Sequence, residues 1–145
     1  MTRRCCSPTQ EPTPLQAAGL KRTPQRQAIL ATLEAADRPL TVEEIRQGMG
    51  DTSSGIPTIY RNLQRFVAEG WIEVLPSPDQ VQRYVRCRSI GHHHHILCEG
   101  CGCVAEVEGC GLEAALADYE RQSGFRLRHH QLTLTGLCPR CQETP

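Results

Sequence analysis

The chain has 145 residues, enough for one domain or two small ones, and its 16 basic and 16 acidic residues leave no formal net charge. The charge is uneven, because residues 1–88 hold 12 Lys and Arg against 9 Asp and Glu, whereas residues 89–145 hold 4 against 7. No apolar stretch approaches the roughly 18 residues of a membrane span, so a membrane protein is not expected. The modest basic excess of the front half is in the direction expected of a DNA-facing surface.

The first residues carry no sign of a folded element. Residues 1–14 contain three prolines and no apolar periodicity, so we expect a loose tail. The Arg3-Arg4 pair has no apolar core after it, so a secretory signal is not predicted.

Three short helices are predicted in the front half, because each start carries an N-terminal signal. Thr23-Pro24 provides an N-cap and a proline at the first helical position. Thr41-Val42-Glu43-Glu44 has the pattern of a capping box, and Ile56-Pro57 opens a third helix that ends at Gly70. The apolar side chains expected to face the core are Ile29, Leu30, Leu33, Ile45, Met49, Ile59, Leu63, Phe66 and Val67.

A β-hairpin is predicted next, from strands at 71–75 and 81–87 joined by a proline-rich turn. Three helices and a hairpin are typical of a winged helix, whose last helix enters the major groove of DNA. The side chains on the outer face of that helix that could contact phosphates or base edges include Tyr60, Arg61, Gln64 and Arg65. An ordinary solvated helix face has the same composition, so this pattern alone leaves DNA binding open.

Two Cys-x-x-Cys pairs in the back half indicate a metal site. Cys98 and Cys101 form one pair, and Cys138 and Cys141 form the other. Each pair can supply two corners of a tetrahedral structural zinc. The chain has nine cysteines, an odd number, and the intact pairs are unlike a secreted disulfide framework, so we expect reduced thiols in the cytoplasm.

The uninterrupted run His92 to His95 offers a second supply of ligands. If the run lies on a strand, His92 and His94 point to one face while His93 and His95 point to the other, so it can serve two metal sites. A single site that uses some of the four, or surface histidines without a ligand role, remain alternatives.

The rest of the back half predicts a small α/β unit. We expect a strand around 104–107, a helix from about 112 to 122 and a strand over 125–135. Periodicity does not decide whether His129 or His130 binds metal. Residues 89–145 number only 57, so such a unit is expected to need a structural metal, a partner subunit or both.

Over residues 15–142 the chain resembles the ferric uptake regulator family of bacterial metal-responsive transcription factors. The resemblance rests on four fragments in order, namely Gly19-Leu-Lys-Arg-Thr-Pro-Gln-Arg26, Thr58-Ile-Tyr-Arg-Asn-Leu63, His92–His95 followed by Cys98-x-x-Cys101, and His130-x-Leu-x-Leu-x-Gly-x-Cys138-x-x-Cys141. It implies an α+β fold with a winged-helix DNA-binding domain at 15–88 and a metal-binding dimerisation domain at 89–145. It also implies that Lys21, Tyr60 and Arg61 contact DNA.

The resemblance implies a ligand role for the paired cysteines, with Cys98, Cys101, Cys138 and Cys141 binding structural zinc. Iron and peroxide sensors of the family usually carry a His just before the second helix, where this chain has Arg38-Pro39-Leu40. This departure, with Glu73 and Cys87 on the hairpin, looks like the zinc uptake regulator branch. In that branch a carboxylate, a cysteine and two histidines bind the sensing zinc, which here implies Glu73, Cys87, His93 and His95.

The other histidine face matches the remaining site of the family, which implies His92, His94, Glu113 and His130. Here His130 is chosen over His129 from the resemblance. Cys103 and Cys110 match no ligand position, and they could be soft-metal ligands, redox-sensitive thiols or small buried side chains.

The sequence therefore predicts a homodimeric zinc-responsive regulator with two to three Zn²⁺ per subunit, which represses zinc-uptake genes when zinc is bound. Its expected partner is a double-stranded DNA operator, an A/T-rich inverted repeat, and neither a small-molecule substrate nor a catalytic constellation is expected. An iron- or peroxide-responsive regulator of the same family is the alternative. A zinc enzyme is a more distant one.

Overall fold

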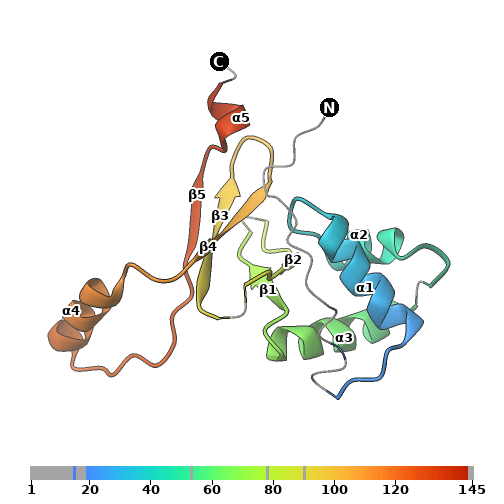
Figure 1. Ribbon diagram of the computed structural model, residues 1–145, viewed down its shortest axis with the longest axis horizontal. Helices are drawn as coiled ribbons and strands as arrows, with labels where there is room; N and C mark the ends of the chain where they lie inside the picture. Colours follow the sequence, from blue (N-terminus) through green and yellow to red (C-terminus); the bar gives the residue numbers. More distant parts are fainter. Residues whose placement is uncertain (1–14, 16–18, 53, 78, 90, 144–145) are drawn as a thin grey trace.

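The computed structural model describes residues 15, 19–52, 54–77, 79–89 and 91–143, so the tail expected at 1–14 lies outside the described residues. Three helices and a two-stranded hairpin lie beside an upright three-stranded sheet, and a fourth helix stands on the far side of that sheet (Figure 1). The elements of the front half are α1 Pro24–Ala35, α2 Val42–Gly48, a 3₁₀ turn Gly50–Thr52, α3 Ile56–Ala68, β1 Ile72–Leu75 and β2 Arg83–Arg86. Those of the back half are β3 His93–Cys98, β4 Val104–Glu108, α4 Glu113–Ser123, β5 Thr133–Gly136 and α5 Pro139–Gln142.

The helix starts lie where their N-terminal signals predicted them. The Thr23 side chain accepts a hydrogen bond from the N–H of Arg26 at the start of α1. At α2, Thr41 accepts from the N–H of Glu44, while the Glu44 carboxylate accepts from the N–H of Thr41 at 2.7 Å. This reciprocal pair confirms the capping box.

One apolar core lies under α1, α2 and α3. Phe66 and Leu63 of α3 are fully buried, and the Phe66 ring packs against Trp71 with ring centroids 5.4 Å apart. Burial of each such side chain contributes about 1.5–3 kcal/mol. Val67, predicted to face inward, is instead 39% exposed, because it lies at the edge of the apolar stripe next to the polar face.

The hairpin β1–β2 is antiparallel, with Glu73 opposite Val85. Its strands are shorter than predicted, at 72–75 and 83–86. Paired hydrogen bonds between Leu40 and Tyr84 join the hairpin to the connection before α2. The hairpin is thereby held against the helices, with Glu73 half-buried on β1.

The second sheet has the order β4-β3-β5, with β3 antiparallel to β4 and parallel to β5. The histidine run enters β3, so His93 and His95 share one face and His94 points to the other. The strand predicted at 125–135 was largely wrong, because the strand begins at Thr133, where pairing with His95 of β3 starts. Residues 125–132 instead lead back from α4, which ends at Gly124 with φ 73°.

The back half has few buried apolar residues of its own. Apart from Cys98 and Cys103, the buried apolar side chains of the described residues all lie between 15 and 87. Helix α4 buries no residue. No helix in the described part of the chain combines the length and apolarity needed to cross a bilayer.

Candidate metal centres

Glu73, Cys87, His93 and His95, which we call the bridging group, come together between the hairpin and the second sheet. Each offers one ligand atom, and these atoms lie within 4.8 Å of one another. Glu73 lies on β1 and Cys87 directly follows β2, whereas both histidines lie on one face of β3. The structure thus brings together the four residues expected to form the sensing site, from two separate sheets.

One ligand nitrogen of the bridging group, Nε2 of His95, has no partner among the described residues. The Nδ1 of His95 lies 2.7 Å from Oε2 of Glu73, and His93 Nε2 lies 3.9 Å from the same oxygen. His95 is 1% exposed, and its Nε2 has no hydrogen-bond partner among the described residues. Burial lowers the pKa of His95 against the opposing effect of Glu73, which favours the neutral imidazole that metals bind.

Cys87 supplies the thiol of the bridging group. It is buried and free, and burial, reinforced by the negative charges of Glu73 and Glu106, raises the pKa of its thiol to about 12. Without a cation this thiol keeps its proton. One sulfur, two imidazoles and one carboxylate suit borderline-soft Zn²⁺ in a tetrahedron.

Two residues that were not predicted from the sequence lie against the bridging group, Gln131 beside Glu73 and Glu106, whose Oε1 is 3.9 Å from Nδ1 of His93. Gln131 donates from Nε2 to Oε1 of Glu73 at 2.6 Å and to the carbonyl of Val74 at 3.3 Å. The Glu106 carboxylate accepts from the N–H groups of Arg88 and Ser89, at 2.8 and 2.7 Å. Burial acts to raise the pKa of Glu106, but the hydrogen bonds from Arg88 and Ser89, with His93 nearby, together lower it. The only signal that could have indicated Glu106 is the pairing of β3 with β4, which sets Glu106 opposite His95.

The paired cysteines gather at the far end of the second sheet. The sulfur atoms of Cys98, Cys101, Cys103 and Cys138 lie within 4.8 Å of one another, and the N–H of Cys138 donates to the Cys98 sulfur at 3.3 Å. Hydrogen bonding, first from the N–H of Cys141, lowers the pKa of Cys138 to about 5. Hydrogen bonding with Cys138 and then Cys98 raises the pKa of Cys141 to about 12, so Cys141 belongs to the same cluster. Three of the four predicted thiols therefore lie within 4.8 Å of one another together with Cys103, which the spacing did not indicate. Cys141, the fourth predicted thiol, lies outside that group and is joined to it by hydrogen bonding with Cys138 and Cys98.

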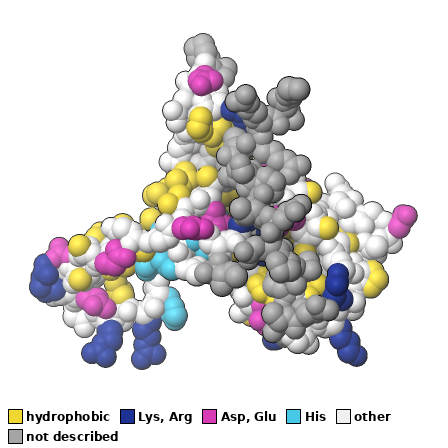
Figure 2. Space-filling view, viewed as in Figure 1, with side chains coloured by type: hydrophobic (Ala, Val, Ile, Leu, Met, Phe, Trp, Pro, Cys, Tyr) yellow, Lys and Arg dark blue, Asp and Glu magenta, His cyan; other side chains and the backbone are white. Residues whose placement is uncertain are grey.

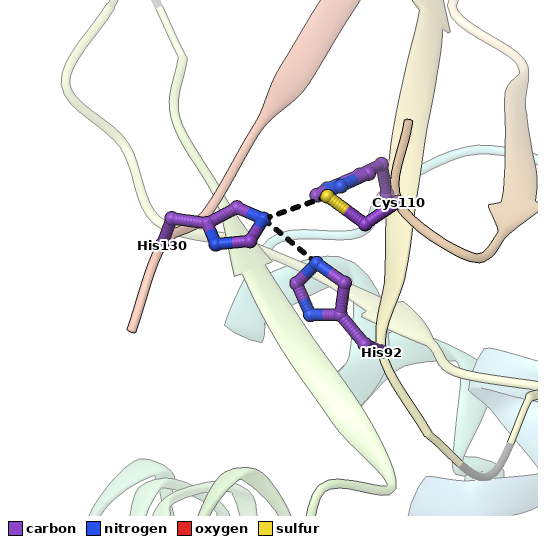
Figure 3. Close-up of side chains that lie close together, drawn as sticks. His92, Cys110 and His130 are labelled. Atoms are coloured by element: carbon purple, nitrogen blue, oxygen red, sulfur yellow. Dashed lines mark hydrogen bonds between the residues drawn. The ribbon is translucent and has the colours of Figure 1, made fainter. Parts of the chain in front are cut away.

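A third group lies on the other face of the histidine run. Histidine side chains gather at the junction between α4 and the rest of the molecule (Figure 2). The members of the third group are His92, His94, Cys110 and His130, with ligand atoms within 4.8 Å of one another. His92 Nε2 and the Cys110 sulfur lie 2.7 and 3.3 Å from Nε2 of His130 (Figure 3). Glu113, expected as the fourth ligand, is exposed and not part of this group.

The residues expected to contact DNA are exposed on the front half. Tyr60 is 38% exposed, and Arg61, Gln64 and Arg65 are exposed on the side of α3 away from the core. Lys21 is exposed before α1, and Arg26 ties that segment to α3 by donating to the Lys21 carbonyl and to Asn62. These side chains are thus available to a partner.

Comparison with known proteins identifies the family of this chain. The model of the ferric uptake regulator family matches residues 17–135. The peroxide-responsive repressor PerR of Staphylococcus saprophyticus is 33% identical over 133 residues, covering 90% of this chain and 88% of that protein. The ferric uptake regulator Fur of Helicobacter pylori, described with three functional metal-binding sites, aligns with a TM-score of 0.61 at 27% identity over 90% of this chain and 87% of that one.

The holo form of XcZur aligns with a higher TM-score of 0.72, at 25% identity over 88% of this chain and 90% of that one. These similarities span both the front half and the back half of the chain. The chain belongs to the ferric uptake regulator family.

Proposed function

We propose that this chain is a zinc-responsive transcription regulator that binds operator DNA as a homodimer and represses zinc-uptake genes when zinc is bound. The observation that carries the proposal is the bridging group, in which the buried Cys87 thiol joins Glu73, His93 and His95 within 4.8 Å. A thiolate is a favourable ligand for zinc and a poor one for manganese. The likeness to XcZur is consistent with this branch of the family.

We assign residues 15–88 to DNA binding and residues 89–145 to dimerisation. In this assignment Cys98, Cys101, Cys138 and Cys141 hold a structural zinc. That zinc stabilises a half that has little apolar core of its own. The reduced thiols fit a protein of the cytoplasm.

The bridging group explains how zinc would control DNA binding. Zinc supplies a fixed four-coordinate link between ligands on the hairpin and ligands on β3. Glu73 and Cys87 move with α3, whereas His93 and His95 move with the dimerising sheet, so joining them fixes the position of each recognition helix relative to the dimer axis. Typical allosteric coupling of about 1–3 kcal/mol corresponds to about 5–150-fold tighter DNA binding.

The exposed face of α3 is the surface we assign to DNA, with Arg61 and Arg65 on phosphates and Tyr60 and Gln64 near base edges. Lys21 lies ahead of α1, where it would reach a minor groove. A two-fold dimer binds two half-sites, so the operator should be an inverted repeat, and we expect it to be A/T-rich. A catalytic role does not fit, because four protein donors leave no open coordination position for a substrate.

A peroxide- or iron-responsive regulator is the second candidate, favoured by the 33% identity to PerR. The two candidates differ in Cys87. A sensor that uses oxygen and nitrogen ligands alone would not need this thiol, whereas the bridging group cannot be completed without it.

The Cys87→Ser variant separates the two functions. We expect operator binding by the wild type to rise as free zinc is buffered upward, and we expect Cys87→Ser to lose that rise while keeping its structural zinc. Fluorescence anisotropy gives the binding curve, and metal analysis of the purified variant shows that the cysteine cluster is intact. A wild-type zinc response in Cys87→Ser would contradict the proposal.

A further inference from the structure

The third group contains ligand nitrogens that no hydrogen bond among the described residues satisfies. His94 is 6% exposed, and neither of its ring nitrogens has a hydrogen-bond partner among the described residues. A buried imidazole without partners costs free energy, because water no longer solvates its polar atoms. Its ring packs edge-on against His92, with centroids 4.6 Å apart, and lies 5.3 Å from the His130 ring.

The contacts among the other members also suit a shared cation. The Nε2 atoms of His92 and His130 are 2.7 Å apart, a contact that a single shared proton or a common cation can satisfy. The Cys110 sulfur approaches the same His130 nitrogen at 3.3 Å. In Figure 3 the side chains of His92 and Cys110 both point toward the His130 ring, and they come from separate segments. Three imidazoles and one sulfur are the ligand types that Zn²⁺ binds in tetrahedral sites.

We propose that Cys110, in place of Glu113, is the fourth ligand of the third site beside His92, His94 and His130, and that this thiolate makes the site selective for borderline and soft cations such as Zn²⁺. The carboxylate of Glu113 takes no part in it. A His₃Cys set disfavours Mn²⁺ and Mg²⁺, which prefer oxygen ligands, more strongly than a set with a carboxylate would.

The position of Cys110 gives this site a structural consequence. Cys110 lies three residues before α4, and His130 lies in the segment that returns from α4 to β5. Helix α4 itself buries no residue. A cation held by both residues closes residues 110–130 into a loop anchored on β3, so metal binding at this site should order α4.

Cobalt titration of the full-length protein tests the site. Thiolate-bound Co²⁺ gives an intense near-ultraviolet charge-transfer band, whereas imidazole and carboxylate ligands do not. The Cys87→Ser variant, isolated with its structural zinc, removes the thiol of the bridging group from the measurement. We expect this variant to show the band, Cys87→Ser/Cys110→Ser to lose it, and Cys87→Ser/Glu113→Gln to keep it.

The same variants give a second readout that does not depend on cobalt. We expect zinc at this site to slow amide hydrogen exchange in residues 113–123, and Cys110→Ser to weaken that zinc binding at least about tenfold. The proposal would be overturned if the band remained in Cys87→Ser/Cys110→Ser or disappeared in Cys87→Ser/Glu113→Gln. It would also be overturned if Cys87→Ser bound cobalt without showing the band. No DNA enters these measurements, so their outcome is separate from that of the zinc-response experiment.

Discussion

Gln131 illustrates how a single side chain can tune the bridging group. Its amide fixes Oε1 of Glu73 at 2.6 Å, while Oε2 of the same carboxylate faces His95 at 2.7 Å. Outer hydrogen bonds of this kind orient a ligand before the metal arrives. Gln131 also connects the segment before β5 to β1, beside the link between the hairpin and β3 that zinc would form.

Gln131→Ala should therefore lower the zinc affinity of the bridging group by about 10–100-fold. Competition with a zinc-binding dye measures the change in the full-length protein. Gln122→Ala is the matched control, because the Gln122 amide donates to Asp118 within α4 and contacts no member of the bridging group. An unchanged affinity in Gln131→Ala would show that Glu73 needs no such support.

For individual residues, the sequence predicted some members of the candidate metal sites and missed others. The alternation of a strand separated His93 and His95 from His92 and His94, and the structure places these pairs in different groups. Cys110 and Gln131 could not be found in this way, because each reaches its group through loops whose path depends on tertiary contacts. That the groups bind zinc remains a prediction.

The start of helix α2 is stabilised by hydrogen bonds to a carboxylate in its first turn. Its Glu44 carboxylate accepts hydrogen bonds from Arg38 and from the N–H of Thr41. The hydrogen bond from Arg38, opposed by burial and helped by Thr41, lowers the pKa of Glu44 from 4.5 to about 2. A carboxyl group whose pKa is lower in the folded state stabilises that state fully above pH 4.5 and loses the contribution as pH falls toward 2.

Glu44→Gln should lower the free energy of unfolding near pH 7 by about 0.5–1 kcal/mol, a value reduced for partial exposure. The difference from the wild type should shrink between pH 4.5 and pH 2. Denaturant unfolding at several pH values measures it, and loss of zinc in acid affects both proteins alike. Asp51→Asn, at an exposed acidic residue in the next turn, should show no such pattern. A difference independent of pH would contradict the assignment.

Elements with local signals were predicted well, and elements that depend on distant pairing were not. The starts of α1, α2 and α3 follow from Thr23, Thr41 and Pro57. The strand expected at 125–135 shrinks to Thr133–Gly136, because a parallel strand exists only where its neighbour β3 runs beside it. The sequence alone does not specify which residues of β5 pair with β3.

Buried apolar side chains are unevenly distributed over the molecule. The apolar core belongs to the front half, whereas the back half leaves large apolar side chains exposed. Hydrophobic side chains also gather along the part of the surface that β5 occupies (Figure 2). The large apolar side chains of the back half that are more than 40% exposed are Val107, Tyr119, Phe125, Leu127, Leu134 and Leu137. Such exposure is expected of a surface that a second subunit covers.

Phe125→Asp should weaken the homodimer by at least about 2 kcal/mol, or about 30-fold in dissociation constant, because Phe125 is 74% exposed in the single chain. Sedimentation equilibrium measures the change. Val81→Asp, at a side chain 44% exposed in the connection between β1 and β2, is the control and should leave dimerisation intact. Equal effects of the two substitutions would show that α4 and β5 do not form the interface.

The mixed helix-and-sheet fold and the family were predictable at the level of the whole molecule, because four motifs in order specify both. How the two halves meet was not predictable, since it depends on the contacts of Glu106 and Gln131 across them.

The most direct test of zinc-dependent regulation is a selection of DNA fragments from the source genome by the full-length protein. Free zinc, iron and manganese would each be buffered across their ranges. We expect a few specific fragments to be retained only as free zinc rises, and to be lost in Cys87→Ser. Retention driven equally by iron or manganese would contradict the zinc assignment and move the chain to another branch of its family.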